Sequence, residues 1–155
     1  MKQIIIDDGT REYSIVNKFG KPICTLHFRP SDISIAERYR EMREGFADIV
    51  KPLTEFDIQA DGTGADDATM NALHEADMKL RAALEQLLDS DDASDVFKSR
   101  NPFSSVGGKF FCEIVLDAIG GIVEEVMAEE AEASRKRTSK YIEEDSDARA
   151  AAADA

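Results

Sequence analysis

The chain has 155 residues, of which 43% are hydrophobic, and this length suits one domain with a modest core. Its formal net charge of −13 repels phosphate, which argues against nucleic-acid binding and favours a basic or hydrophobic partner. No apolar run approaches the roughly 18 to 20 residues of a membrane helix, and two cysteines are too few for a disulfide framework, so we expect a cytoplasmic protein.

Three short strands are expected in the first thirty residues. The candidates are the runs Gln3–Ile6, Glu12–Asn17 and Ile23–Arg29, which are separated by glycine-containing turn sequences. Alternation in the third run directs Leu26 and Phe28 toward a core. A small meander of this kind needs helices to cover its apolar face.

Three helices are expected after the sheet, each with an apolar stripe at helical spacing. The first begins after a cap at Ser31 or Asp32, the second runs from about Asp67 to Leu88, and the third runs from about Gly108 to at least Ala131. Asp77 interrupts the second stripe and is expected to lie at its margin or to pair with a cation. The stripes consist of Ile35, Tyr39, Met42, Phe46, Ile49 and Leu53; of Met70, Leu73, Leu80, Leu84 and Leu87; and of Phe111, Ile114, Val115, Ala118, Ile122 and Val126.

Residues 1–131 are therefore predicted to form a single α+β domain. It comprises a short N-terminal antiparallel β-meander followed by three main α-helices, the last one long. Gly120 and Gly121 lie inside that last helix and indicate either close helix packing or a kink. Residues 132–155 are charged and then alanine-rich, and we expect a helical extension that ends in a disordered tail.

Candidate metal and calcium sites fail at named positions. Cys24 and His27 are three residues apart on an expected strand and so face opposite ways, while His74 and Cys112 are isolated. The run Asp57–Gly62 has Gln59 at the third position of a calcium loop, which breaks the expected ligand ladder, and the closing glutamate of such a loop is also missing. We expect neither a metal nor a cofactor.

Catalytic motifs are equally incomplete. Ser105–Lys109 resembles the end of a phosphate-binding loop, but phenylalanines occupy the required glycine and hydroxyl positions. Paired acids such as Glu124 and Glu125 fit a solvated helix face better than acid–base catalysis. An enzyme would need a deep pocket with converging polar groups, so we predict a non-enzymatic protein.

Two surfaces are predicted to bind protein. One is the stripe of the first helix, which would pair with a second copy if one chain does not cover it. The other is the irregular segment that follows the second helix, where we expect exposed aromatic side chains. The predicted contact residues are Tyr39, Met42 and Phe46 in the stripe and Phe97, Phe103 and Val106 in the segment.

Three short motifs carry a family resemblance. They are Asp95-Val96-Phe97, the pair Gly107-Gly108, and Phe111 followed by Ile114 and Val115 at the start of the last helix. In this order, after a β-meander and two helices, they resemble the tail assembly chaperones of long-tailed phages and prophages of Gram-positive bacteria. The resemblance covers most of residues 1–130. The charged extension and the loop around residues 57–67 depart from the family pattern.

The resemblance implies a function. Chaperones of this family bind the long, hydrophobic tape-measure protein, keep it soluble, and are shed when tail tube subunits polymerise around it. They often self-associate, so we expect a homo-oligomer. The alternative is an acidic adaptor or regulatory module that binds its partner through the tail Glu143–Ala155.

Overall fold

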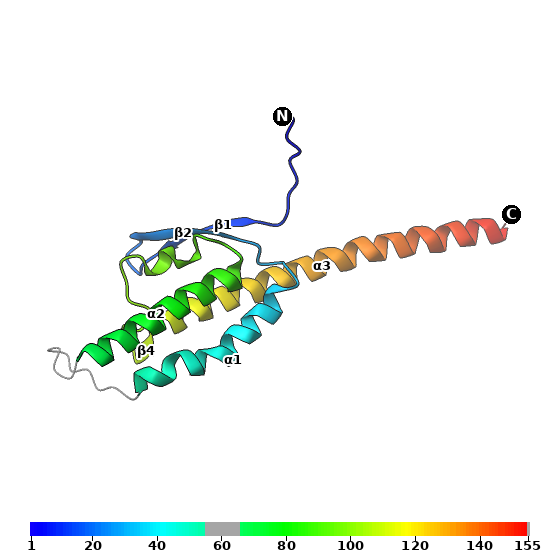
Figure 1. Cartoon of the computed structure of the whole chain (residues 1–155). Coiled ribbons are helices and arrows are strands. Elements are labelled where there is room, and N and C mark those ends of the chain that lie inside the picture. The colour runs from blue at the N-terminus through cyan, green and yellow to red at the C-terminus, as the bar shows by residue number, and fades with distance from the viewer. Residues whose placement is uncertain (55–65, 155) are drawn as a thin grey trace.

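The computed structural model describes residues 1–54 and 66–154, so the calcium-like run Asp57–Gly62 lies outside the described residues. A two-stranded antiparallel sheet precedes three helices, the last of them long, which confirms the α+β class (Figure 1). In chain order the elements are β1 (Arg11–Val16), β2 (Pro22–Phe28), α1 (Ile35–Thr54), α2 (Asp67–Leu88), the 3-10 helix η1 (Ala93–Phe97), β3 (Ser105–Val106), β4 (Lys109–Phe110) and α3 (Phe111–Asp154).

The β1–β2 hairpin is closed by an asparagine and a glycine. The Asn17 side chain accepts hydrogen bonds from the backbone N–H groups of Phe19 and Lys21, and Gly20 adopts a positive φ of 80°. The register places Tyr13 opposite Leu26. Leu26 and Phe28 are buried, as the alternation predicted, so one face of the hairpin belongs to the core.

The prediction of a strand at Gln3–Ile6 is wrong. These residues form no strand, and Ile4, Ile5 and Ile6 are 86%, 93% and 76% exposed. The side chains of Asp7 and Asp8 accept hydrogen bonds from the backbone two residues further on, which turns the chain before β1. A β-branched run becomes a strand only beside a strand with which it can pair, and this segment has no such partner within residues 1–54 and 66–154.

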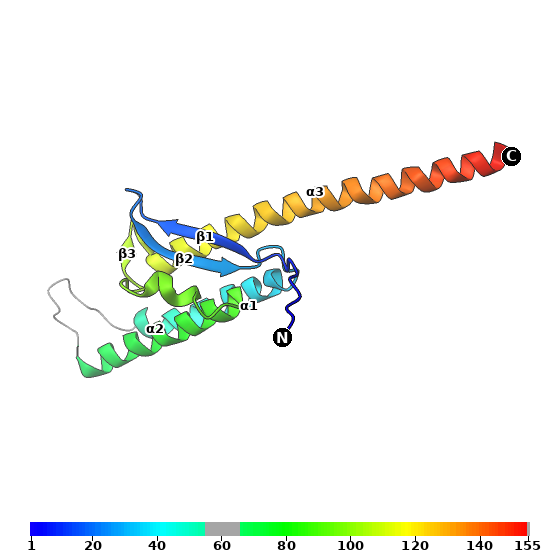
Figure 2. The same cartoon turned by 90° about the horizontal axis from the view of Figure 1, so that it is seen from above.

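Helices α1 and α2 lie side by side and antiparallel (Figures 1 and 2). Asp66 caps α2 by accepting a hydrogen bond of 2.8 Å from the Thr69 backbone N–H. Asp89 ends the helix in a left-handed conformation, with φ of 49°. Asp77, expected at the margin of the stripe or paired with a cation, binds Arg81 at 2.8 Å.

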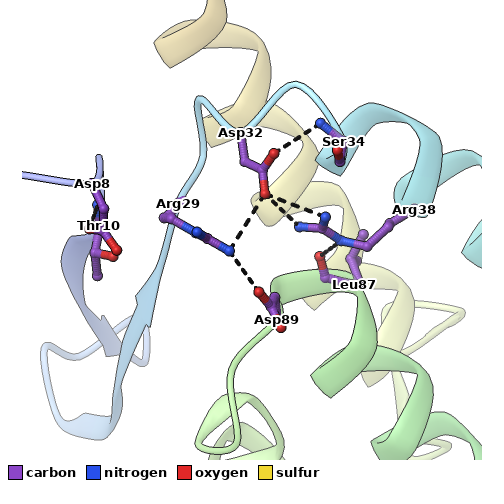
Figure 3. Close-up of polar contacts among 8 residues, drawn as sticks. All are labelled: Asp8, Thr10, Arg29, Asp32, Ser34, Arg38, Leu87 and Asp89. Carbon is purple, nitrogen blue, oxygen red and sulfur yellow. Dashed lines mark hydrogen bonds and ion pairs between the residues drawn. The ribbon is translucent and has the colours of Figure 1, made fainter.

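A polar cluster joins the end of β2 to the facing ends of α1 and α2 (Figure 3). Arg29 contacts the Asp89 carboxylate at 2.6 Å and the Asp32 carboxylate at 3.7 Å. Arg38 contacts Asp32 at 3.4 Å and donates a 2.9 Å hydrogen bond to the carbonyl oxygen of Leu87. This guanidinium therefore satisfies a carbonyl in the last turn of α2, where the helix dipole favours a cation.

A short hairpin leads into α3. Gly107 and Gly108 both have positive φ and form its two-residue turn, so glycine is required there by the backbone. The first turn of α3 is anchored by hydrogen bonds from the Phe111 and Cys112 N–H groups to the carbonyl oxygens of Ser104 and Pro102. The helix begins at Phe111 rather than near Gly108, because the residues before it pair as strands.

Helix α3 has a packed half and a projecting half. At Gly120 it approaches α1 so closely that an added Cβ would lie 2.8 Å from the Tyr39 hydroxyl oxygen, so this glycine marks close packing. Arg11 of β1 reaches Glu129 and Glu130 at 3.8 Å and 3.7 Å. All residues from 128 to 152 are exposed, and the helix runs past the body as far as Asp154 (Figures 1 and 2). The charged residues from 132 onward, expected as an extension with a disordered end, lie in this helix.

Candidate functional site

An apolar groove of about 440 Å³ lies between the β1–β2 hairpin and the packed half of α3. Helix α3 contributes one broad face to it, because residues three or four apart share a side of a helix. The groove is lined by Ile15, Val16, Asn17, Lys18, Ile23, Leu26 and Phe28 from the hairpin, by Val96, Arg100 and Val106 from the segment between α2 and α3, and by Phe111, Ile114, Val115, Ala118, Ile119 and Ile122 from α3.

The groove is open to solvent along its edges. Val16, Val106 and Ile114 line it and are themselves exposed, so three large apolar side chains of the groove are open to solvent. Phe19, at the tip of the hairpin, is 83% exposed beside the lining residue Lys18. Clustered exposed apolar side chains of this kind mark a binding surface, whereas single ones do not.

Two cationic side chains give the groove a positive charge. Lys18 and Arg100 are the charged residues of the lining, and neither forms an ion pair within the described part of the chain. The rest of the lining is apolar apart from Asn17. The groove is thus an apolar surface with a positive edge on a chain of net charge −13.

The titratable groups near the hairpin serve the fold. Burial raises the pKa of the Cys112 thiol to about 12, and burial also raises the pKa of the half-buried Cys24. His27 is exposed on the other face of β2 from Cys24 and lies 3.1 Å from Asp92 and 2.9 Å from Glu12, whose hydrogen bonds raise its pKa. In residues 1–54 and 66–154, no group of three or more His, Cys, Asp or Glu residues is arranged to hold a metal ion.

The segment expected to expose aromatic side chains is folded inward instead. Phe97 and Phe103 are buried, as is Pro102 between them, so the expectation of exposure is wrong for these residues. The Phe97 ring packs edge-on against Phe111 with centroids 5.9 Å apart, and Phe103 packs in the same way against Phe110 at 5.5 Å. An irregular segment has no periodicity from which burial can be deduced, and η1 and β3–β4 turn these rings into the core.

Val106 alone among the six predicted contact residues lines the groove. Met42 is buried, while Tyr39 and Phe46 are half-buried and pack against the core cluster. The Tyr39 hydroxyl donates a 3.3 Å hydrogen bond to the carbonyl oxygen of Leu116 in α3. The stripe of α1 is therefore mostly an internal packing surface, and the six residues do not form one patch.

Five of the six groove residues of α3 belong to the apolar stripe predicted for this helix, which omits Ile119, and none of the six was predicted as a contact. Val115 and Ile119 are buried, whereas Ile114 and Ala118 are exposed. The sequence did carry a signal for this surface. The apolar face of this helix is wider than the single stripe that a surface helix needs for contact with the core.

No protein-family model, curated protein or solved structure matches this chain. Among its described helices, none is both long enough and apolar enough to cross a membrane.

Proposed function

We propose that this protein is a non-enzymatic phage tail assembly chaperone that holds an apolar helical segment of the tape-measure protein in its groove, in the cytoplasm of the bacterial host. The observation that carries the proposal is the open apolar groove between the hairpin and α3, which offers a helix partner a preformed hydrophobic surface. Tail tube subunits would then displace the chaperone.

The residues that carry the family resemblance support the proposal by their position. Val96, from the first motif, lines the groove, and Phe97 beside it packs against Phe111 of the third motif. Gly107 and Gly108 form the turn that presents Val106 at the rim. The three motifs, separate in the sequence, thus converge around one surface.

Charge and size suit a chaperone that must later release its client. A net charge of −13 keeps a complex soluble while its apolar segment is covered. A groove of about 440 Å³ is a modest contact, so the client is not held by one very large interface.

The test uses two alanines of α3 that are both exposed. Ala118 lines the groove, whereas Ala133 lies on the projecting half, so Ala118→Glu and Ala133→Glu make the same change in different places. We expect the native chain and Ala133→Glu to keep a co-expressed tape-measure protein soluble and to co-purify with it, and Ala118→Glu to lose both properties. A tape-measure protein that is equally soluble without the chaperone, or with Ala118→Glu, would contradict the proposal.

The projecting half of α3 favours a second candidate, the acidic adaptor. Residues 128–152 are exposed and include Tyr141 and Ile142, two large side chains that a partner can contact. Deleting residues 141–155, which removes both side chains together with the acidic tail, separates the two functions. An adaptor would lose its partner after this deletion, whereas the chaperone proposed here would still bind the tape-measure protein.

A further inference from the structure

The segment Gln3–Ile6 is an apolar strand-forming sequence that pairs with no strand in the described part of the chain. Its three isoleucines are largely exposed and do not belong to the hydrophobic core of the described residues. Three consecutive exposed β-branched residues are unfavourable in water and have high strand propensity. This segment is therefore a ready-made ligand for an apolar surface beside an open sheet edge.

The base of the segment directs it away from the chain's own groove. Asp7 and Asp8 form turns with Gly9 and Thr10, and β1 then runs from Arg11 toward the groove residues Ile15 and Val16. Figures 1 and 2 both show residues 1–8 leaving the body from the start of β1, the end of the hairpin opposite its tip. The groove lies toward that tip, so a second copy can supply the segment without bending it back.

The outer edge of β1 offers backbone groups for such a segment. In the described sheet β1 pairs with β2 alone, and β2 packs against η1 on its other side. An unpaired edge accepts an added strand through main-chain hydrogen bonds, while pockets for alternate side chains give specificity.

We propose that Gln3–Ile6 of a second copy of this chain lies extended along β1 and fills the groove, and that two copies exchange these segments reciprocally. Alternation along a strand places Ile4 and Ile6 against Ile114 and Ala118 of α3 and leaves Ile5 facing solvent. Each copy thereby covers the other's exposed apolar surface, which gives a closed two-fold dimer.

Charge complementarity fixes which end of the segment lies at which end of the groove. Asp7 and Asp8 follow the isoleucines directly, and Lys18 and Arg100 are the cations of the groove. We place the two carboxylates toward these two cations. A pure apolar contact would not discriminate between the two directions, whereas the attraction between these opposite charges favours one of them.

The experiment is the molar mass of the full chain in solution, measured by size-exclusion chromatography with light scattering at tens of micromolar in 0.15 M salt. We expect twice the 17.1 kDa of one chain for the native protein and for Ile5→Asp. We expect the mass of one chain for the double variant Ile4→Asp/Ile6→Asp and for Ala118→Glu. Because the three isoleucines are exposed, their substitution should leave the fold intact, and circular dichroism checks this for every variant.

Two results would overturn the inference. A native chain that is strictly monomeric would do so, including one whose residues 3–6 are protected from hydrogen exchange by docking on their own groove. A dimer that survives Ile4→Asp/Ile6→Asp would show that a different surface associates. A tape-measure segment and the Gln3–Ile6 segment of a second copy would compete for the same groove. The double variant Ile4→Asp/Ile6→Asp separates the two proposals, because it should abolish the dimer and leave the groove free to bind the tape-measure protein.

Discussion

At the scale of single residues, Gly120 and Gly121 are neighbours in one helix with different surroundings. Alanine in place of a helical glycine stabilises by up to about 1 kcal/mol where space allows. A Cβ at Gly121 meets nothing within 4 Å, so Gly121→Ala should raise the free energy of unfolding by about that amount. A Cβ at Gly120 lies 2.8 Å from the Tyr39 hydroxyl, so Gly120→Ala should gain less or lose stability. Urea unfolding measures both.

Tyr39 provides the control for this comparison. In a Tyr39→Phe background the hydroxyl that an alanine at position 120 would meet is absent. Gly120→Ala should therefore be less unfavourable there than in the native chain, a coupling that a double-mutant cycle detects. Equal effects in both backgrounds would show that the hydroxyl is not what limits residue 120.

His27 should make stability depend on pH in a definite direction. Hydrogen bonds to Asp92 and Glu12 raise its pKa above the ordinary 6.5, so the folded chain favours the protonated ring. The stabilisation is fully present below pH 6.5 and is lost as the pH rises through the folded pKa. His27→Gln should therefore lower the unfolding midpoint at pH 6 and have a smaller effect at pH 9. Matched urea titrations at the two pH values measure this, and an equal loss at both would contradict it.

At the scale of elements, Arg38 links α1 to the end of α2. Its Nε donates to the Leu87 carbonyl oxygen while the same guanidinium contacts Asp32, a pairing that lysine cannot reproduce. We expect Arg38→Lys to cost about 1 to 2 kcal/mol of unfolding free energy. Arg40→Lys, on an exposed side of the same helix, is the matched control and should change it by less than about 0.5 kcal/mol.

The elements that the sequence predicted well are those with long periodic stripes. Both ends of α2 agree with the structure, because spacing and capping residues mark them. Helix α1 begins at Ile35, three residues beyond Asp32, the later of its two predicted caps. The strand prediction for Gln3–Ile6 is wrong because strand propensity does not reveal whether a partner strand exists. The sequence predicts a loop where the β3–β4 hairpin lies, because its strands have two residues each, too few to show alternation.

The candidate site was less predictable than the fold. The apolar face of α3 was visible in the sequence, but its exposure depends on where the hairpin lies, which local pattern does not encode. Phe97 and Phe103 were misjudged for the converse reason, since tertiary packing buries residues in a segment without regular structure. Val106 was predicted as a contact because it is an apolar residue in an irregular segment, and it lines the groove.

At the scale of the whole molecule, the body of the fold should not depend on the projecting helix. Every residue from 128 to 152 is exposed, and the last contacts to the hairpin are made by Glu129 and Glu130. A chain that ends at Ser134 keeps those contacts, so its free energy of unfolding should stay within about 0.5 kcal/mol of the native value. Circular dichroism should show lost helix without a shifted urea midpoint. A loss above about 1 kcal/mol would mean that the removed residues stabilise the body.

Helix α3 also sets a fixed distance between the groove and the projecting half of the helix. With a rise of about 1.5 Å per residue, Tyr141 stands roughly 28 Å along the helix axis from Ile122 at the end of the groove. The helix therefore holds a molecule bound in the groove and another bound to Tyr141 and Ile142 at about this separation. They can occupy the protein together without steric conflict, so a single copy has the geometry to bridge two bodies at a fixed spacing.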